Sequence, residues 1–200
     1  MKWMLVALAA SSAPQPSCEL HVWPAFATGS QAAGWLSNLG IAGALQDYER
    51  NKDDRLRSQA DLIQALPPQK QAKIIDSLNL QGQPGLGPAR IVFEGKFVNA
   101  RVAKKANERQ SASAASCYAE LIVSRNIYKS SPLHGRTLST ELIFRDFRNG
   151  RPRSLHKTQT AKLAKSDAPL ADTEVAAAFR ANVSAFIERL HPIPARRSSR

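Results

Sequence analysis

Cysteine and histidine are the residues of this chain with the widest chemistry, and the chain has two cysteines and four histidines. A cysteine thiolate becomes a nucleophile where a histidine base is positioned beside it. No histidine lies in a local pattern with Cys18 or Cys117, and the histidines lack the H-x-H and H-x-x-x-H spacings of metal sites. We therefore predict no metal and no other cofactor. The histidines are His21, His134, His156 and His191.

Other catalytic patterns are also missing from the sequence. The G-x-S-x-G motif of hydrolase nucleophiles does not occur. Glu141 and Asp146 share a predicted strand, but they alternate to opposite faces and cannot act together from that strand alone. The prediction is therefore a protein without enzyme activity. The alternative is a hydrolase whose site is assembled by the fold, with His156 or His21 as the general base.

Cys18 has three alternative roles, as a lipid anchor, as half of a disulfide or as a nucleophile. Of the residues before it, only Ser17 fits the pattern of an acylated lipoprotein, since Gln15 and Pro16 do not. Two cysteines in an exported chain most simply pair, and a link closing about 100 residues restricts the unfolded chain by several kcal/mol. We therefore favour a Cys18–Cys117 disulfide, which requires Cα atoms within about 7 Å. A lipid anchor on Cys18 is the alternative, and a catalytic thiol ranks last.

The first residues have the composition of a secretion signal. Lys2 supplies a positive charge, residues 3–10 (WMLVALAA) form an apolar run, and residues 11–13 are small. We predict a signal peptide over residues 1–13 and a mature protein in the periplasm or outside the cell. The run is shorter than the roughly 20 residues that cross a bilayer, so no transmembrane helix is expected. The alternative is a buried first element of a cytosolic protein.

The chain is strongly basic, with 28 Lys and Arg against 16 Asp and Glu and a formal net charge of +12. Such a charge attracts polyanions, and in an exported protein these are lipopolysaccharide, anionic phospholipid or acidic proteins. Nucleic acid is the less favoured partner, because its binding calls for aromatic side chains interleaved with the basic ones. The residues predicted to form an anion-binding surface are Lys104, Lys105, Arg109, Arg145, Arg148, Arg151, Arg153 and Lys157.

The amino-terminal half is predicted to begin with one strand. Residues 19–25 alternate between apolar and polar side chains, which is typical of a strand. Residues 28–45 are rich in Gly, Ala and Ser and predict a loop with a short helix. The mixed charge run 47–57 predicts a solvated segment.

Two short helices are expected next, separated by prolines. Ser58 and Asp61 form an S-x-x-D start for the first helix, which Pro67 and Pro68 must end. Pro68 suits the first turn of the second helix. The segment 82–88 (GQPGLGP) lacks the spacing and the Lys-Ser/Thr pair of a phosphate-binding loop, so it is predicted to be a connector. The apolar stripe of the second helix is Ile74, Ile75 and Leu78.

The carboxyl-terminal half is predicted to be sheet followed by helix. Residues 89–98 predict a strand, and the polar stretch 101–116 predicts a loop or a ragged strand end. The alternating runs 118–128 and 138–147, joined by a turn with Pro and Gly, predict an antiparallel hairpin. Residues 151–165 are basic and poor in apolar residues.

Side-chain alternation predicts which residues of the hairpin share a face. In its first strand Ile127 is expected beside Leu121, and Asn126 on the opposite face. In its second strand Leu138, Thr140, Leu142 and Phe144 are expected on one face. A final helix is expected with Asp172 as its cap. Its apolar stripe is Val175, Phe179, Val183, Phe186, Ile187 and Leu190.

This order of elements predicts an α/β (α+β) domain with a mostly antiparallel sheet of about four to five strands, a long carboxyl-terminal amphipathic helix and short helices packed on the sheet. Residues 118–130 (YAELIVSRNIYKS) and 136–152 (RTLSTELIFRDFRNGRP), with Asp146 and Gly150 at a turn, resemble a recurring periplasmic module. The module occurs in the amino-terminal domain of TolB and in curli-secretion, peptidoglycan-synthase-activator and transport-auxiliary lipoproteins. The resemblance spans roughly residues 89–190 and implies a non-catalytic envelope protein that binds other proteins.

The sequence is therefore consistent with three functions. The first is an exported binding or assembly module built from residues 14–194, with residues 195–200 as a basic disordered tail. The second is a polyanion-binding protein, and the third is a hydrolase with an unrecognised site.

Overall fold

The structure is a computed structural model that describes most of the chain. The described residues are 18–26, 28–32, 51–82, 89–96, 98–105, 107–131, 135–148, 153–164 and 170–190. The predicted signal peptide, the connector beyond residue 82, the basic tail, His134 and His191 lie outside these residues.

Six strands form one mixed sheet in the order β3-β1-β4-β5-β6, with β2 also paired to β4. The pairings of β1 with β3 and β4, and of β2 with β4, are parallel. The two longest pairings, β4 with β5 and β5 with β6, are antiparallel. The mixed α/β class and the antiparallel hairpin are confirmed, with more strands than the four to five predicted. The strands are β1 (Cys18–Trp23), β2 (Thr28–Ala32), β3 (Ala89–Phe93), β4 (Tyr118–Ser131), β5 (Gly135–Asp146) and β6 (Arg153–Lys162).

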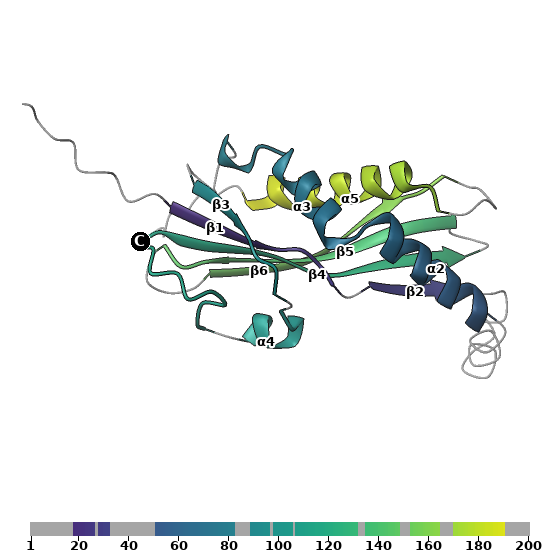
Figure 1. The fold of residues 1–200 in the computed structure, drawn as a ribbon, viewed down its shortest axis with the longest axis horizontal. Coiled ribbons are helices and arrows are strands. Elements are labelled where there is room, and N and C mark those ends of the chain that lie inside the picture. The colour runs from purple at the N-terminus through teal and green to yellow at the C-terminus, as the bar shows by residue number, and fades with distance from the viewer. Residues whose placement is uncertain are drawn as a thin grey trace, which may run out of the picture.

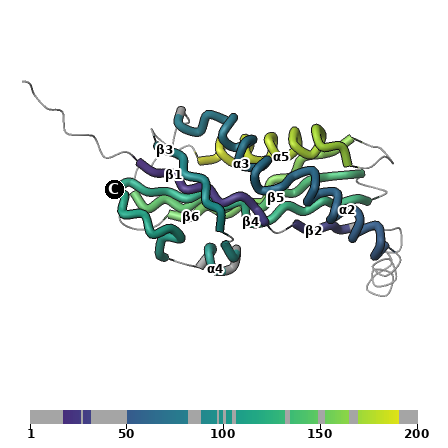
Figure 2. The backbone as a smooth tube through the Cα atoms, in the orientation of Figure 1, coloured from purple at the N-terminus to yellow at the C-terminus, as the bar shows by residue number. Residues whose placement is uncertain are grey.

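Helices lie on both faces of the sheet (Figure 1). α2, α3 and α5 lie along one face, here called the α5 face, and the short α4 lies on the other, here called the α4 face. The tube in Figure 2 shows the same arrangement, with β1 running between β3 and β4. The helices are α2 (Lys52–Ala65), α3 (Pro68–Asp76), α4 (Ala100–Lys105) and α5 (Asp172–Ile187), with 3-10 turns at Leu80–Gly82 and Glu188–Leu190.

The main core fills the space between the sheet and α5. Leu121, Leu138 and Leu142 meet Phe179 and Phe186 there, all at most 1% exposed. Burying each such side chain contributes about 1.5–3 kcal/mol. The predicted stripe of the final helix is confirmed, since its residues from Val175 to Ile187 are buried and Leu190 packs against them half-buried.

A β-bulge between Val123 and Arg125 reverses the alternation of β4. Leu121 and Val123 face α5 before the bulge, and Tyr128 faces it afterwards. Asn126 also faces α5, because its Oδ1 accepts a hydrogen bond from Thr140 Oγ1 at 3.0 Å, and Asn182 Nδ2 of α5 donates to that same Oγ1 at 3.1 Å. The prediction that Ile127 shares a face with Leu121, and Asn126 does not, was therefore wrong.

Two helix starts also differ from the prediction. α2 begins at Lys52, six residues before Ser58, with Asp53 and Asp54 in its first turn, where carboxylates interact favourably with the helix dipole. Ala171, and not Asp172, is the N-cap of α5. The Asp172 carboxylate instead accepts from Lys70 Nζ of α3 at 3.1 Å. The predicted end of α2 before Pro67 and the start of α3 at Pro68 are confirmed.

Three elements formed where no such element was predicted. Residues Thr28–Ala32, expected in a loop, are β2, and the basic stretch after residue 151 contains β6. Part of the expected loop 101–116 is α4, which docks through Ala103 against Trp23. All three elements are held by pairing or docking to the rest of the sheet, which local periodicity does not reveal.

Candidate functional site

The Cys18–Cys117 disulfide stands at one end of the sheet, where β1 and β4 both begin. The two cysteines are bonded, with their Cα atoms 4.5 Å apart, so the predicted pairing is confirmed. The Glu19 amide also donates to the Cys117 carbonyl at 2.9 Å. This double link fixes the carboxyl end of the segment that leads into β4.

Strand register places a row of polar side chains beside the disulfide on the α4 face. His21 of β1 is the register partner of Glu120 of β4, which is in turn the partner of Arg145 of β5. Their exposed fractions are 4%, 0% and 1%. Three buried ionisable side chains therefore follow each other across three neighbouring strands.

Glu120 and Arg145 form the most deeply buried part of this row. Arg145 Nη1 lies 2.9 Å from Glu120 Oε2. The other carboxylate oxygen, Oε1, accepts from the Tyr118 hydroxyl at 2.8 Å and from the Gln110 amide at 2.6 Å. Arg145 Nη2 donates to the Glu108 carbonyl at 2.5 Å. The pair thus ties the segment preceding β4 to the sheet.

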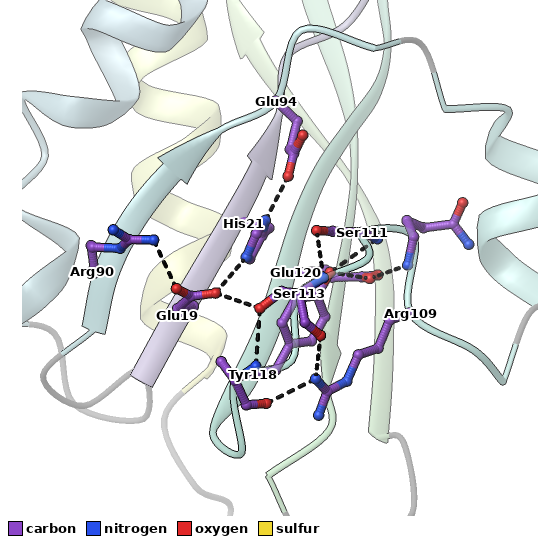
Figure 3. A network of polar contacts seen from close by, with 11 residues as sticks. Glu19, His21, Arg90, Glu94, Arg109, Ser111, Ser113, Tyr118 and Glu120 are labelled. Atoms are coloured by element: carbon purple, nitrogen blue, oxygen red, sulfur yellow. Dashed lines mark hydrogen bonds and ion pairs between the residues drawn. The ribbon is translucent and has the colours of Figure 1, made fainter. Parts of the chain in front are cut away.

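His21 lies between two carboxylates, as Figure 3 shows. Its Nδ1 is 2.6 Å from Glu94 Oε1, and its Nε2 is 3.1 Å from Glu19 Oε2. The ring also lies 4.8 Å from the ring of Tyr118, measured between centroids. Both ring nitrogens are therefore occupied by groups of the protein itself.

The segment 107–117 covers this row and is held to it by many hydrogen bonds (Figure 3). Ser113 Oγ donates to Glu19 Oε2 at 2.5 Å, and the Ser111 amide donates to the Tyr118 hydroxyl at 3.3 Å. The Arg109 guanidinium stacks over the Tyr118 ring at 4.5 Å from its centroid. Arg109 also donates to two carbonyls of its own segment, those of residues 113 and 115, at 2.9 and 2.8 Å. We call 107–117, with its contacts to Glu19, Tyr118 and Glu120, the clamp segment.

Hydrogen bonds shift the ionisation of two residues in the network. Donation by Ser113, followed by that of His21 and Arg90, lowers the pKa of Glu19 from 4.5 to about 2. Burial, together with the hydrogen bond to the Glu120 carboxylate, raises the pKa of the Tyr118 phenol. Glu19 therefore stays an acceptor, and Tyr118 a donor, throughout the physiological range.

The side chains of the network bond mainly to one another. A general base needs a ring nitrogen within reach of the proton it removes. Both nitrogens of His21 already face carboxylates, and the Ser113 hydroxyl donates to Glu19 and not to His21. The arrangement is therefore not that of a nucleophile activated by a histidine.

A second row of side chains, this one apolar, lies next along the same face. Trp23, Ile122 and Ile143 are register neighbours on β1, β4 and β5, and Ala103 of α4 packs on them. This small cluster separates the buried polar row from a more exposed one around Glu141.

Glu141 gathers three nitrogen-bearing side chains around one carboxylate. It lies 2.9 Å from Lys104 Nζ, 3.0 Å from His156 Nε2 and 3.6 Å from Arg125 Nε. Burial opposes its ionisation, but donation by Lys104, Ser124 and His156 holds its pKa below the usual value. His156, the other predicted candidate base, is thus engaged in an ion-pair cluster.

Several residues of the predicted anion-binding surface contact other groups of the protein. Arg145 is buried in its pair with Glu120, and Lys104 is paired with Glu141. Arg148 donates from Nη2 to Asp146 Oδ2 at 2.7 Å and from Nε to Asp146 Oδ1 at 2.8 Å. These hydrogen bonds hold the pKa of Asp146 below its usual value, although burial opposes this. Arg109 is half-buried in the clamp segment.

Three of the eight predicted residues are exposed: Lys104 on α4, and Arg153 and Lys157 on β6. Arg151 and the side chain of Lys105 lie outside the described part of the structure. Lys104 is paired with Glu141, so the rest of this exposed positive charge lies on one edge strand.

The sequence indicated some residues of the polar network but did not predict that they meet. Glu19 and His21 alternate onto one face of a predicted strand, and Glu120 interrupts an otherwise apolar run. Glu94 and Ser113 join them only through the parallel pairing of β1 with β3 and β4, which no local pattern indicates.

The described residues include no group of three or more His, Cys, Asp or Glu side chains placed to hold a metal ion. None of the helices in this part of the chain is long and apolar enough to span a membrane. Neither a protein-family model nor a curated protein matches the chain. A solved structure entitled "Crystal structure of uncharacterized protein" matches with 12% identity and a TM-score of 0.27, over 88% of this chain and 94% of that chain.

Proposed function

We propose that the protein is a non-catalytic binding or assembly module of the cell envelope. The observation that carries the proposal is the closure of the polar network on itself: His21 meets a carboxylate at each ring nitrogen, and Ser113 donates to Glu19. Groups arranged in this way hold a surface in shape and leave no acid or base for a substrate. The role of the network is then to keep the clamp segment rigid.

An exported location is part of the proposal and is supported by the disulfide. Disulfides persist in the periplasm and outside the cell, whereas cytosolic thiols are kept reduced. The Cys18–Cys117 link closes a separation of 99 residues and lies directly beside the polar network. Residues 1–13 act in this proposal as the cleaved signal peptide.

We also propose that the domain has the fold of the periplasmic module found in TolB and in the envelope lipoproteins. The long β4–β5 hairpin and the final helix α5, which packs on β5 and β6, support this likeness. Because a fold hosts many functions, the likeness adds only the expectation that the partner is another protein.

The experiment is recovery of the intact, oxidised protein from its own envelope under increasing salt. At about 1 M salt, where the screening length is about 3 Å, attraction by exposed charge is lost, while a packed interface persists. The proposal predicts that one protein partner stays bound in a fixed ratio. Release of every partner by salt would instead assign the function to charge alone, as in the polyanion-binding alternative.

The hydrolase alternative is tested in parallel with two histidine variants. His156→Asn leaves the buried network untouched, and His21→Asn removes its centre. A hydrolytic activity of the purified protein that either variant abolishes while the fold is retained would overturn the proposal.

A further inference from the structure

β6 forms one outer edge of the sheet and is long and regular. It is the last strand in the order β3-β1-β4-β5-β6 and has 10 residues. Its register with β5 runs from Arg153 to Lys162 without a shift. Natural edge strands are usually shortened, bulged or interrupted by proline, because an open edge can pair with another chain. β6 has none of these three devices, and its protection is limited to its charged side chains.

The register fixes which backbone groups of β6 point away from the sheet. The Leu163 amide donates to the Arg136 carbonyl at 2.9 Å, so these two residues form a hydrogen-bonded pair. Such pairs alternate along an antiparallel ladder. The odd-numbered residues of β6 therefore bond to β5, and the even-numbered ones direct their N–H and C=O groups outward. The outward residues are Ser154, His156, Thr158, Thr160 and Lys162.

The charge of β6 is of one sign. The strand contains Arg153, Lys157 and Lys162 and neither Asp nor Glu. All three basic side chains are exposed. Arg153 acts electrostatically on Asp146, its register partner, but Lys157 and Lys162 form no ion pair with any described residue. The edge therefore offers both backbone hydrogen-bonding groups and uncompensated positive charge.

We propose that β6 is a docking edge for an extended acidic segment of a partner protein, which adds to the sheet as a further strand. Main-chain hydrogen bonds to the outward groups of β6 supply affinity, and the basic side chains select glutamate or aspartate at the facing positions. This inference rests on the proposed binding function and names its surface and the chemistry of its partner.

The same charges act against pairing of β6 with a second copy of itself. Two copies placed edge to edge would bring basic side chains opposite basic side chains, and like charges directly opposite are destabilising. An acidic strand meets the opposite condition. Charge complementarity thus favours a different chain over a homodimer at this edge.

The direct test uses a defined peptide and the full-length oxidised protein. The probe is a peptide as long as β6 with alternating glutamate and valine, and its controls are the lysine and valine version and an N-methylated version of the acidic peptide. N-methylation keeps the charge but blocks the N–H groups. The proposal predicts binding of the acidic peptide, no binding of the basic one, and loss of about fivefold or more in affinity on N-methylation.

Two variants test the edge from the side of the protein. Thr158→Pro removes an outward N–H without breaking a bond to β5, and proline is tolerated in this position of an edge strand. The double variant Lys157→Glu with Lys162→Glu reverses the charge and leaves the backbone intact. Each variant is expected to bind the acidic peptide more weakly. The charge reversal should lower the affinity by about tenfold at low salt. Lys73→Glu, an exposed lysine on α3, is the matched control and should bind as the unaltered protein does.

Several outcomes would overturn the inference. Equal binding of the N-methylated and unmethylated peptides, or of any anion such as single-stranded DNA to the same extent, would show attraction by charge without strand pairing. A dimer that Thr158→Pro dissociates would assign the edge to a second copy. If the envelope partner stays bound at high salt to both edge variants, β6 is not the docking edge, yet the binding function stands; if the unaltered protein retains no partner, the function itself fails.

Discussion

Arg145 and Glu120 are an ion pair sealed within the sheet, with Arg145 Nη1 2.9 Å from Glu120 Oε2 and both side chains at most 1% exposed. The two residues are register partners on β5 and β4. A one-residue slip of the hairpin would move one of them to the opposite face and leave each charge without its partner. The pair therefore specifies the register of the β4–β5 hairpin.

Removing the positive partner alone should be strongly destabilising. Arg145→Met leaves the Glu120 carboxylate buried without its cation, and breaking a buried pair in this way costs about 3–5 kcal/mol. We expect a loss of this size in the free energy of unfolding measured by urea denaturation. Arg153→Met, at an exposed position eight residues along the chain, should change stability by no more than about 0.5 kcal/mol. Similar small effects for both variants would contradict the burial of the pair.

Stability should fall in acid because of Glu19. Its pKa is about 2 in the folded protein against an ordinary 4.5, so folding is favoured by its ionised form. This contribution is complete above pH 4.5 and is lost as the pH falls toward 2. Glu19→Gln should flatten the stability curve over that interval. A curve with unchanged slope would show that Glu19 is not held by Ser113 and His21.

Reduction of the disulfide should destabilise the fold and free the clamp segment. In the chain-entropy model a link across about 100 residues contributes about 4.7 kcal/mol, and the Cys18–Cys117 separation is 99. The Cys18→Ala and Cys117→Ala double variant should lose several kcal/mol in urea denaturation. The amides of residues 110, 111 and 113 should then exchange their hydrogens faster. Unchanged protection of these amides would mean that the polar contacts alone hold the segment.

The exposed edge should tolerate proline where the interior ladder does not. Thr158→Pro removes a hydrogen-bond donor that points away from the sheet, whereas Lys157→Pro removes one that bonds to β5. Thermal unfolding should therefore show a small change for Thr158→Pro and a loss of about 3 kcal/mol for Lys157→Pro. Equal losses would mean that the assignment of outward groups along β6 is wrong.

Periodicity predicted the elements whose side chains alternate between core and solvent. The hairpin of β4 and β5 and the stripe of α5 bury leucine, valine and phenylalanine at regular spacing, and these predictions are confirmed. β6 was missed because only Gln159 of its residues is buried, so the strand carries almost no apolar signal. Its strand conformation comes from pairing with β5, which is a tertiary effect.

The candidate site was predictable only in its covalent part. Cysteine count and a signal-like leader were enough to predict the Cys18–Cys117 pairing. The predicted anion-binding surface included buried residues because sequence alone does not distinguish a solvated arginine from one that pairs inside a sheet. Arg145 is the clearest case, since its partner Glu120 lies in an apolar run where an unpaired carboxylate would be costly.

We propose that the network around His21 clamps residues 107–117 and performs no chemistry. The most direct test is the free energy of unfolding of His21→Asn, measured with hydrogen exchange of the clamp segment. We predict a loss of about 2 kcal/mol or more, because Glu19 and Glu94 are left without their shared partner, together with faster exchange at residues 110, 111 and 113. Unchanged stability and protection, with loss of binding or of an activity, would contradict the claim and make His21 part of a functional site.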